Sequence, residues 1–130
     1  MGNIKKQILI VDDEEEICDF LKEALEKRGF EITSATTGEE AIKIFSKNSP
    51  DLTIVDMNLT STISGLELIR KCREMRPQAK IIAMTGYVDM KLKEDAFRLG
   101  VLDYLEKPSD IQPEVILGRI EKALGHKSPS

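Results

Sequence analysis

Acidic, hydroxyl and cationic side chains stand at the ends of short apolar runs in this chain. These residues are Asp12, Asp13, Asp56, Thr85 and Lys107. Carboxylates can bind cations or act as nucleophiles, whereas a hydroxyl and an ammonium can donate hydrogen bonds to an anionic group. Whether the five groups act together depends on the elements that carry them.

The first apolar run, QILIV at 7–11, leads directly into five consecutive acids at 12–16. Two like charges about 4 Å apart repel by roughly 4 kcal/mol at an effective dielectric near 20, so this cluster needs compensation. A helix start would provide it for most of the run. Acids in a first turn face the positive end of the helix dipole, and Asp13 could cap the helix, with Glu16 three residues on. That leaves Asp12 unexplained at the end of a buried strand.

Strand-like and helix-like segments alternate along the chain. We expect strands at 7–11, 30–35, 52–57, 80–86 and 102–106. Helical apolar stripes follow each strand, within 17–25, 41–45, 66–72, 88–99 and 111–124. Capping boxes at 37–40 and 64–67 start the second and third helices, and Pro113 must fall within the first turn of the last one.

Five strands, each followed by a helix, imply a parallel sheet with helices on both faces. Such sheets bind ligands in the crevice beyond the carboxyl ends of their strands, where the strand order reverses. All five candidate side chains lie at those ends. We therefore expect three acids, a hydroxyl and a cation to converge on one edge of the sheet.

Length and charge limit the classes of protein. With 130 residues, 41% hydrophobic and 32% charged, the chain fits one soluble domain over 1–130, with its core at about 6–124 and a short tail at 125–130. A net charge of −4 without a dense basic block argues against nucleic acid and anionic membranes as partners. No apolar stretch approaches the roughly 20 residues of a membrane span, and no signal-peptide pattern occurs, so we expect a cytoplasmic location and a protein partner or small ligand.

The cysteines do not form a metal-binding pattern. Cys18 and Cys72 are far apart in the sequence, and His126 is the single histidine, so a zinc or iron–sulfur site lacks its ligands. We expect both cysteines to be reduced, packed thiols.

The pattern ILIVDDE, TIVDMN, IIAMTG and DYLEKP resembles the receiver domain of two-component response regulators, and in particular chemotaxis-regulator-like members, from about residue 6 to about residue 124. The resemblance implies an α/β, flavodoxin-like, doubly wound five-stranded parallel sheet in the order 2-1-3-4-5, which a chemotaxis member of the family shares. Five helices would complete a three-layer architecture.

By the same resemblance, Asp56 accepts a phosphoryl group from a histidine of a sensor kinase or phosphotransfer protein. Asp13 and Asp56 would bind Mg²⁺ directly, with help from the main-chain carbonyl of Asn58, while Asp12 would act through bound water. Mg²⁺ prefers oxygen ligands of this kind. Three carboxylates would be balanced by the divalent ion and Lys107.

The resemblance also implies a switch. Thr85 and Lys107 would bind phosphoryl oxygens that are absent before transfer, and the ring of Tyr104 would move inward as the threonine shifts. A cis bond between Lys107 and Pro108 is implied as well. The result would be altered binding to a downstream protein target or effector domain, so the chain would be a signalling phosphoacceptor that catalyses only its own phosphorylation and dephosphorylation.

The sequence departs from the family around the phosphoacceptor. Family members usually have proline four residues after it and glycine eight after it, whereas this chain has Thr60 and then Gly65, so the loop at 59–64 is one residue longer and lacks a stiffening proline. Gly86 replaces a small alanine after the threonine. Tyr87 is bulky at the mouth of the expected site, and we expect it to slow attack of water on the phosphoaspartate.

Each residue also has an ordinary interpretation. Asp56 could cap a loop, Thr85 could belong to a turn, Lys107 could be a solvated lysine and Tyr104 a half-buried sheet tyrosine. Two other functions stay open. Residues 56–60, DMNLT, approximate the DxDxT motif of haloacid-dehalogenase-type phosphohydrolases, but Asn58 cannot serve as the general acid there. A pseudo-receiver that only binds partners is the other alternative.

Overall fold

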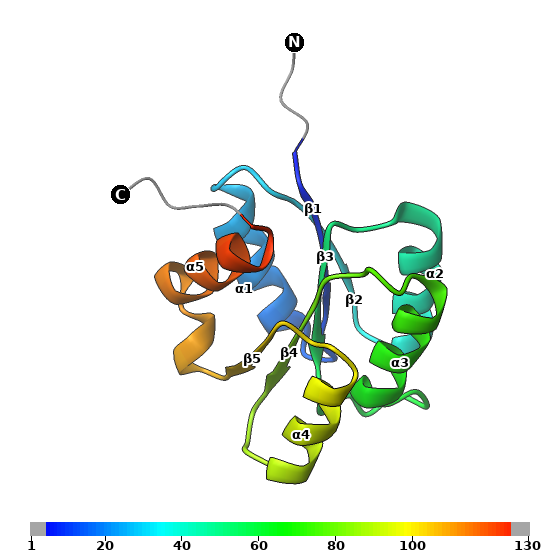
Figure 1. Cartoon of the computed structure of the whole chain (residues 1–130). Coiled ribbons are helices and arrows are strands. Elements are labelled where there is room, and N and C mark those ends of the chain that lie inside the picture. The colour runs from blue at the N-terminus through cyan, green and yellow to red at the C-terminus, as the bar shows by residue number, and fades with distance from the viewer. Residues whose placement is uncertain (1–4, 126–130) are drawn as a thin grey trace.

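The computed structural model describes residues 5–125, in which five strands alternate with helices (Figure 1). The strands are β1 (Gln7–Val11), β2 (Glu31–Ala35), β3 (Leu52–Asp56), β4 (Ile81–Thr85) and β5 (Asp103–Glu106). The helices are α1 (Glu15–Glu26), α2 (Gly38–Asn48), α3 (Gly65–Met75), α4 (Met90–Arg98) and α5 (Pro113–Ala123), with a short 3₁₀ turn, η1 (Ser109–Ile111), before the last. The tail at 126–130, with His126, lies outside the described residues.

All five strands are parallel, and their order is β2-β1-β3-β4-β5, as the resemblance implied. The strand order reverses between β1 and β3, because β2 lies on one side of β1 and every later strand lies on the other. A crevice at the carboxyl ends of these two strands is therefore the expected ligand position for this topology.

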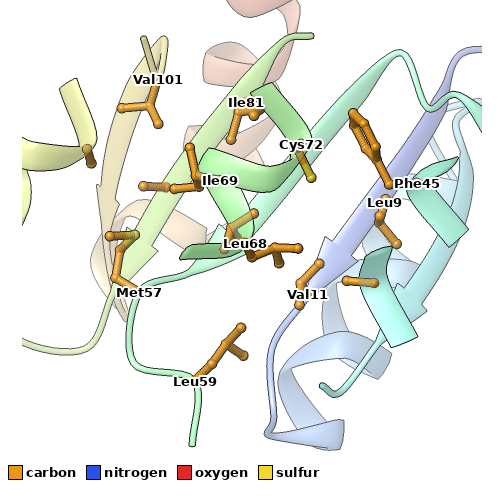
Figure 2. Packing of buried hydrophobic residues seen from close by; sticks show 14 of the residues in the cluster. Leu9, Val11, Phe45, Met57, Leu59, Leu68, Ile69, Cys72, Ile81 and Val101 are labelled. Atoms are coloured by element: carbon orange, nitrogen blue, oxygen red, sulfur yellow. The ribbon is translucent and has the colours of Figure 1, made fainter. Parts of the chain in front are cut away.

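Helices cover both faces of the sheet, giving the predicted three layers. Figure 1 shows α1 and α5 on one side of the sheet and α2 and α3 on the other. Buried side chains from α2, α3 and α4 form one core with alternate strand residues such as Leu9 and Val11 (Figure 2). The intervening residues Ile8 and Ile10 point to the opposite face and pack with α1 and α5. This alternation is the two-residue period of a strand buried on both sides.

The helix starts mostly follow the sequence signals. Thr37 and Ser64 accept the backbone N–H of the residue three positions on, at 3.1 Å in each case, so both predicted caps form. Pro113 is the first residue of α5, as its position required.

Two details of the predicted helices are wrong. Val88 precedes α4, because Asp89 caps that helix by accepting the N–H of Leu92 at 3.1 Å. Phe20, which belongs to the predicted apolar stripe within 17–25, is exposed, because the buried stripe of α1 runs through Cys18, Leu21 and Leu25 instead.

Both cysteines are buried and free, as predicted. Burial raises the pKa of the Cys18 thiol to about 11 and that of the Cys72 thiol to about 12. Within residues 5–125, no helix combines the length and the apolar composition that crossing a membrane requires.

Candidate functional site

Three carboxylates meet at the carboxyl edge of the sheet. Each of Asp12, Asp13 and Asp56 offers an oxygen, and these oxygens all lie within 4.8 Å of one another. The strand register explains the meeting, because Val11 of β1 pairs with Val55 of β3 and an aspartate follows each of them. Asp12 is fully buried, and Asp56 is 2% exposed.

Asp12 is held by two hydrogen bonds. One carboxylate oxygen accepts the backbone N–H of Glu14 at 2.9 Å, and the other accepts Lys107 Nζ at 2.8 Å. Burial by itself would lower the pKa of the Lys107 ammonium, but the hydrogen bond to Asp12 and the nearby charge of Asp56 raise it above its ordinary value. The fully buried acid that a helix start could not explain is therefore the partner of a lysine from the far end of the chain.

Asp56 lies between Lys107 and the backbone of its own loop. Its Oδ1 accepts the N–H of Asn58 at 2.9 Å, and its Oδ2 lies 3.6 Å from Lys107 Nζ. Burial raises the pKa of the Asp56 carboxyl to about 6, with a further increase from the charge of Asp12, against the lowering effects of the Asn58 N–H and Lys107. The carboxylate is ionised at neutral pH, but its charge is not fully compensated by these contacts.

Asp13 does not cap α1, so that alternative is wrong. The residue before the helix is Glu14, whose side chain makes no capping bond. Oδ2 of Asp13 instead accepts the hydroxyl of Thr60 at 2.7 Å and its N–H at 3.3 Å. These hydrogen bonds link the loop after β1 to the loop after β3.

Thr85 is buried at the end of β4, and its hydroxyl faces two acceptors. Oγ1 lies 2.6 Å from the carbonyl oxygen of Tyr87 and 2.9 Å from Oδ1 of Asn58. The N–H of Gly86 also donates to Oδ1 of Asn58, at 3.0 Å. A hydroxyl has one hydrogen, so these acceptors compete for it. The amide oxygen of Asn58 therefore accepts the N–H of Gly86 and shares the Thr85 hydroxyl with the carbonyl of Tyr87.

The role of the Asn58 side chain was not predicted. Sequence reasoning assigned only the main-chain carbonyl of Asn58, and no local motif indicates a contact between residues 58 and 85. The contact depends on the pairing of β3 with β4, which brings Asp56 opposite Met84.

Tyr104 points into the protein from β5. It is 6% exposed, its ring centroid lies 6.2 Å from that of Phe97, and Lys93 Nζ lies 5.6 Å from the ring centre. Burial raises the pKa of the Tyr104 hydroxyl, against a lowering effect of the nearby Thr85 side chain. Tyr104 is thus more deeply buried than the half-buried sheet tyrosine of the ordinary interpretation.

An open pocket adjoins the acids and includes Tyr87. Its polar lining includes Asp56, Asn58 and Lys107, and its apolar lining includes Ile17 and Ile111. Tyr87 is 66% exposed at this pocket. The peptide bond between Lys107 and Pro108 is cis, as expected.

Known proteins resemble this chain over almost its whole length. The model of the response regulator receiver domain matches residues 8–121. The sporulation initiation phosphotransferase F of Bacillus subtilis is 31% identical over 125 residues, which cover 96% of this chain and 98% of that protein. The photosynthetic apparatus regulatory protein RegA of Rhodovulum sulfidophilum is 40% identical over 103 residues, covering 79% of this chain and 56% of RegA.

The solved structures agree with the sequence matches. A CheY-like response regulator receiver domain protein from Methanospirillum hungatei JF-1 superimposes with a TM-score of 0.88 and 32% identity, covering 94% of this chain and 95% of that one. The chain spans about half the length of RegA. Fold, site and comparisons together show that this chain belongs to the response regulator receiver domain family.

Proposed function

We propose that this chain is the phosphoacceptor of a two-component phosphorelay, in which Asp56 takes a phosphoryl group from a histidine of a sensor kinase or phosphotransfer protein. The observation that carries the proposal is the burial of Asp56 beside Asp12, Asp13 and Lys107 at the carboxyl edge of the sheet. A purely structural acid would not need two further acids as neighbours.

The three acids fit Mg²⁺. They offer oxygen ligands, and with Lys107 counted they leave a formal charge of −2, which a divalent ion would balance. Asp13 and Asp56 would bind the ion directly with the main-chain carbonyl of Asn58, and Asp12 through water. When bound, Mg²⁺ would neutralise phosphoryl oxygens that would otherwise be repelled by the acids.

Asp56 would act as the nucleophile in its ionised form, so the reaction needs no general base. A carboxylate oxygen forms the new bond to phosphorus while the bond from phosphorus to the donor's imidazole nitrogen breaks, and the electron pair leaves with the imidazole. Lys107 would donate to the transferred group. Its present contact with Asp12 keeps the ammonium within 3.6 Å of Asp56.

The phosphoryl group would then change the loop after β4. The Gly86 N–H now donates to Oδ1 of Asn58, and the Thr85 hydroxyl lies within hydrogen-bond distance of that oxygen and of the Tyr87 carbonyl. Both donors would turn to phosphoryl oxygens, and this differential binding would favour a second arrangement of the loop, with adjustment of Tyr104. The downstream protein target or effector domain would distinguish the two arrangements.

The phosphohydrolase alternative is not proposed. Its general acid would have to be residue 58, and the Asn58 amide here holds the loop after β4. The other alternative is a pseudo-receiver, which binds partners without being phosphorylated. A phosphorylation assay distinguishes it from a phosphoacceptor.

The test is intact-mass measurement after incubation with Mg²⁺ and acetyl phosphate. We expect one added phosphoryl group on the wild type, none on Asp56→Asn, and none on the wild type when EDTA removes the metal. Asp19→Asn changes an exposed acid of α1 and should be labelled like the wild type. If the folded wild type is not labelled, the phosphoacceptor proposal is wrong and the chain is an interaction module that is not phosphorylated.

A further inference from the structure

Thr60 occupies the position where the family usually has proline, and its polar groups both contact Asp13. The hydroxyl donates to Oδ2 of Asp13 at 2.7 Å, and the N–H donates to the same oxygen at 3.3 Å. Proline has neither donor. The substitution therefore adds two hydrogen bonds to one of the three acids, and it does so across two loops that are far apart in the sequence.

The loop that carries Thr60 is anchored on both sides. Leu59 is buried in the core with Leu68 and Val11, and Figure 2 shows its side chain directed from the loop toward them. Ser61 accepts the N–H of Gly38 at 3.1 Å and donates to the carbonyl of Ile63 at 2.8 Å. Thr60 is held between these anchors, so its donors do not depend on proline for their position.

Asp13 is the least buried of the three acids, and it lies among like charges. Repulsion from Asp12 and Asp56 favours rotation of this carboxylate toward solvent, away from its neighbours. Two donors on Oδ2 oppose that rotation and leave the other oxygen free to bind a cation. Groups that orient metal ligands in this way commonly affect metal affinity strongly.

We propose that Thr60 is a positioning residue for magnesium, acting through the Asp13 carboxylate in place of the stiff proline loop. The inference rests on the proposed function, because it assumes that the acids bind Mg²⁺. It concerns only how this chain orients one of them.

The test compares Thr60→Val, which removes the hydroxyl but keeps the shape and the N–H, with Thr60→Ser, which keeps the hydroxyl. Thr62→Val changes an exposed threonine of the same loop and is the matched control. Magnesium affinity is read from amide chemical shifts in an NMR titration. We expect Thr60→Val to weaken binding about 10-fold, at the lower end of such effects, while Thr60→Ser and Thr62→Val bind like the wild type.

A second readout separates positioning from general damage to the fold. In acetyl phosphate labelling, the Mg²⁺ concentration for half-maximal rate should rise by the same factor in Thr60→Val, whereas the rate at saturating Mg²⁺ should equal that of the wild type. Equal or tighter magnesium binding by Thr60→Val, or binding by Thr60→Ser that is weakened as much as that of Thr60→Val, would overturn the inference alone. A wild type that binds no Mg²⁺ would instead overturn the proposed function.

Discussion

Asp56 is an ionisable group whose burial links protonation to folding. Its folded-state pKa of about 6 lies above the ordinary value of 3.8, so the folded protein holds this proton more tightly than the unfolded chain does. The stability that comes from the protonated form is fully present below pH 3.8 and is lost as pH rises through about 6. At neutral pH without a metal, the ionised acid therefore costs folding free energy.

We therefore expect Asp56→Asn to be more stable than the wild type at pH 7.5 in EDTA, by about 1–3 kcal/mol, because the amide carries no charge. Urea unfolding measures the difference, which should become smaller at pH 5, where the wild-type carboxyl is mostly protonated. Asp19→Asn removes an exposed charge and should change stability by less than about 0.5 kcal/mol at either pH. Equal stability of Asp56→Asn and wild type at pH 7.5 would refute the electrostatic cost.

The ring of Tyr87 is exposed at the pocket that Asp56 also lines. If the ring limits access of water to the phosphoaspartate, Tyr87→Ala should speed loss of the phosphoryl group by a few-fold, roughly 2- to 10-fold for about 0.4–1.4 kcal/mol of barrier. Tyr87→Phe keeps the ring and should retain the wild-type rate. The decay of the phosphorylated mass after removal of acetyl phosphate gives both rates, and an unchanged rate in Tyr87→Ala would exclude a shielding role.

The junction from β3 to α3 decides where Asp56 and the loop after it lie. Gly65 begins α3, and a Cβ placed on it would lie 2.4 Å from the carbonyl oxygen of Asp56 and 2.8 Å from Cα of Met57. Both neighbours are backbone atoms. The loop at 59–64, although one residue longer than usual, therefore still leads into a glycine. The start of α3 packs so closely against the end of β3 that there is no space for a side chain at this position.

Gly65→Ala should therefore destabilise the protein by more than about 2 kcal/mol and reduce phosphorylation, since the backbone at Asp56 must shift to admit the methyl group. Gly118→Ala is the control, because a Cβ at this exposed position of α5 meets nothing within 4 Å. There the change should stabilise by about 0.5–1 kcal/mol through better helix propensity. Chemical unfolding and acetyl phosphate labelling measure the two effects. If Gly65→Ala proved as stable as the wild type, the junction would be less constrained than its contacts indicate.

The elements also show how far the sequence can predict this site. Asp12, Asp56, Thr85 and Lys107 could be placed because apolar runs mark buried strands and parallel strands align their carboxyl ends. The bond from Thr60 to Asp13 could not, because it depends on the path of an irregular loop with no periodic signal. Local signals also suggested the wrong partner for Asp13, since a capping pattern takes no account of a loop that arrives from β3.

The candidate site exists only when the whole sheet has formed. Asp12 and Asp13 follow β1, Asp56 ends β3, Thr85 ends β4 and Lys107 follows β5. Two separate cores, one on each face, hold these strands in register. An unfolded chain would scatter the carboxylates, so a cation that needs them together binds the folded state and stabilises it.

Magnesium should accordingly raise the unfolding temperature. At about ten times its dissociation constant, an ion that binds only the folded state contributes about 1.4 kcal/mol, which is a shift of roughly 3–6 °C for a domain of this size. Sodium chloride at equal ionic strength controls for screening of the like charges, and it should give a smaller shift. Asp13→Asn, which loses one carboxylate while the three-layer core stays intact, should lose most of the magnesium-specific part. Scanning calorimetry of both proteins in the two salts measures this, and an equal shift in all four samples would mean that the acids respond to ionic strength and hold no ion.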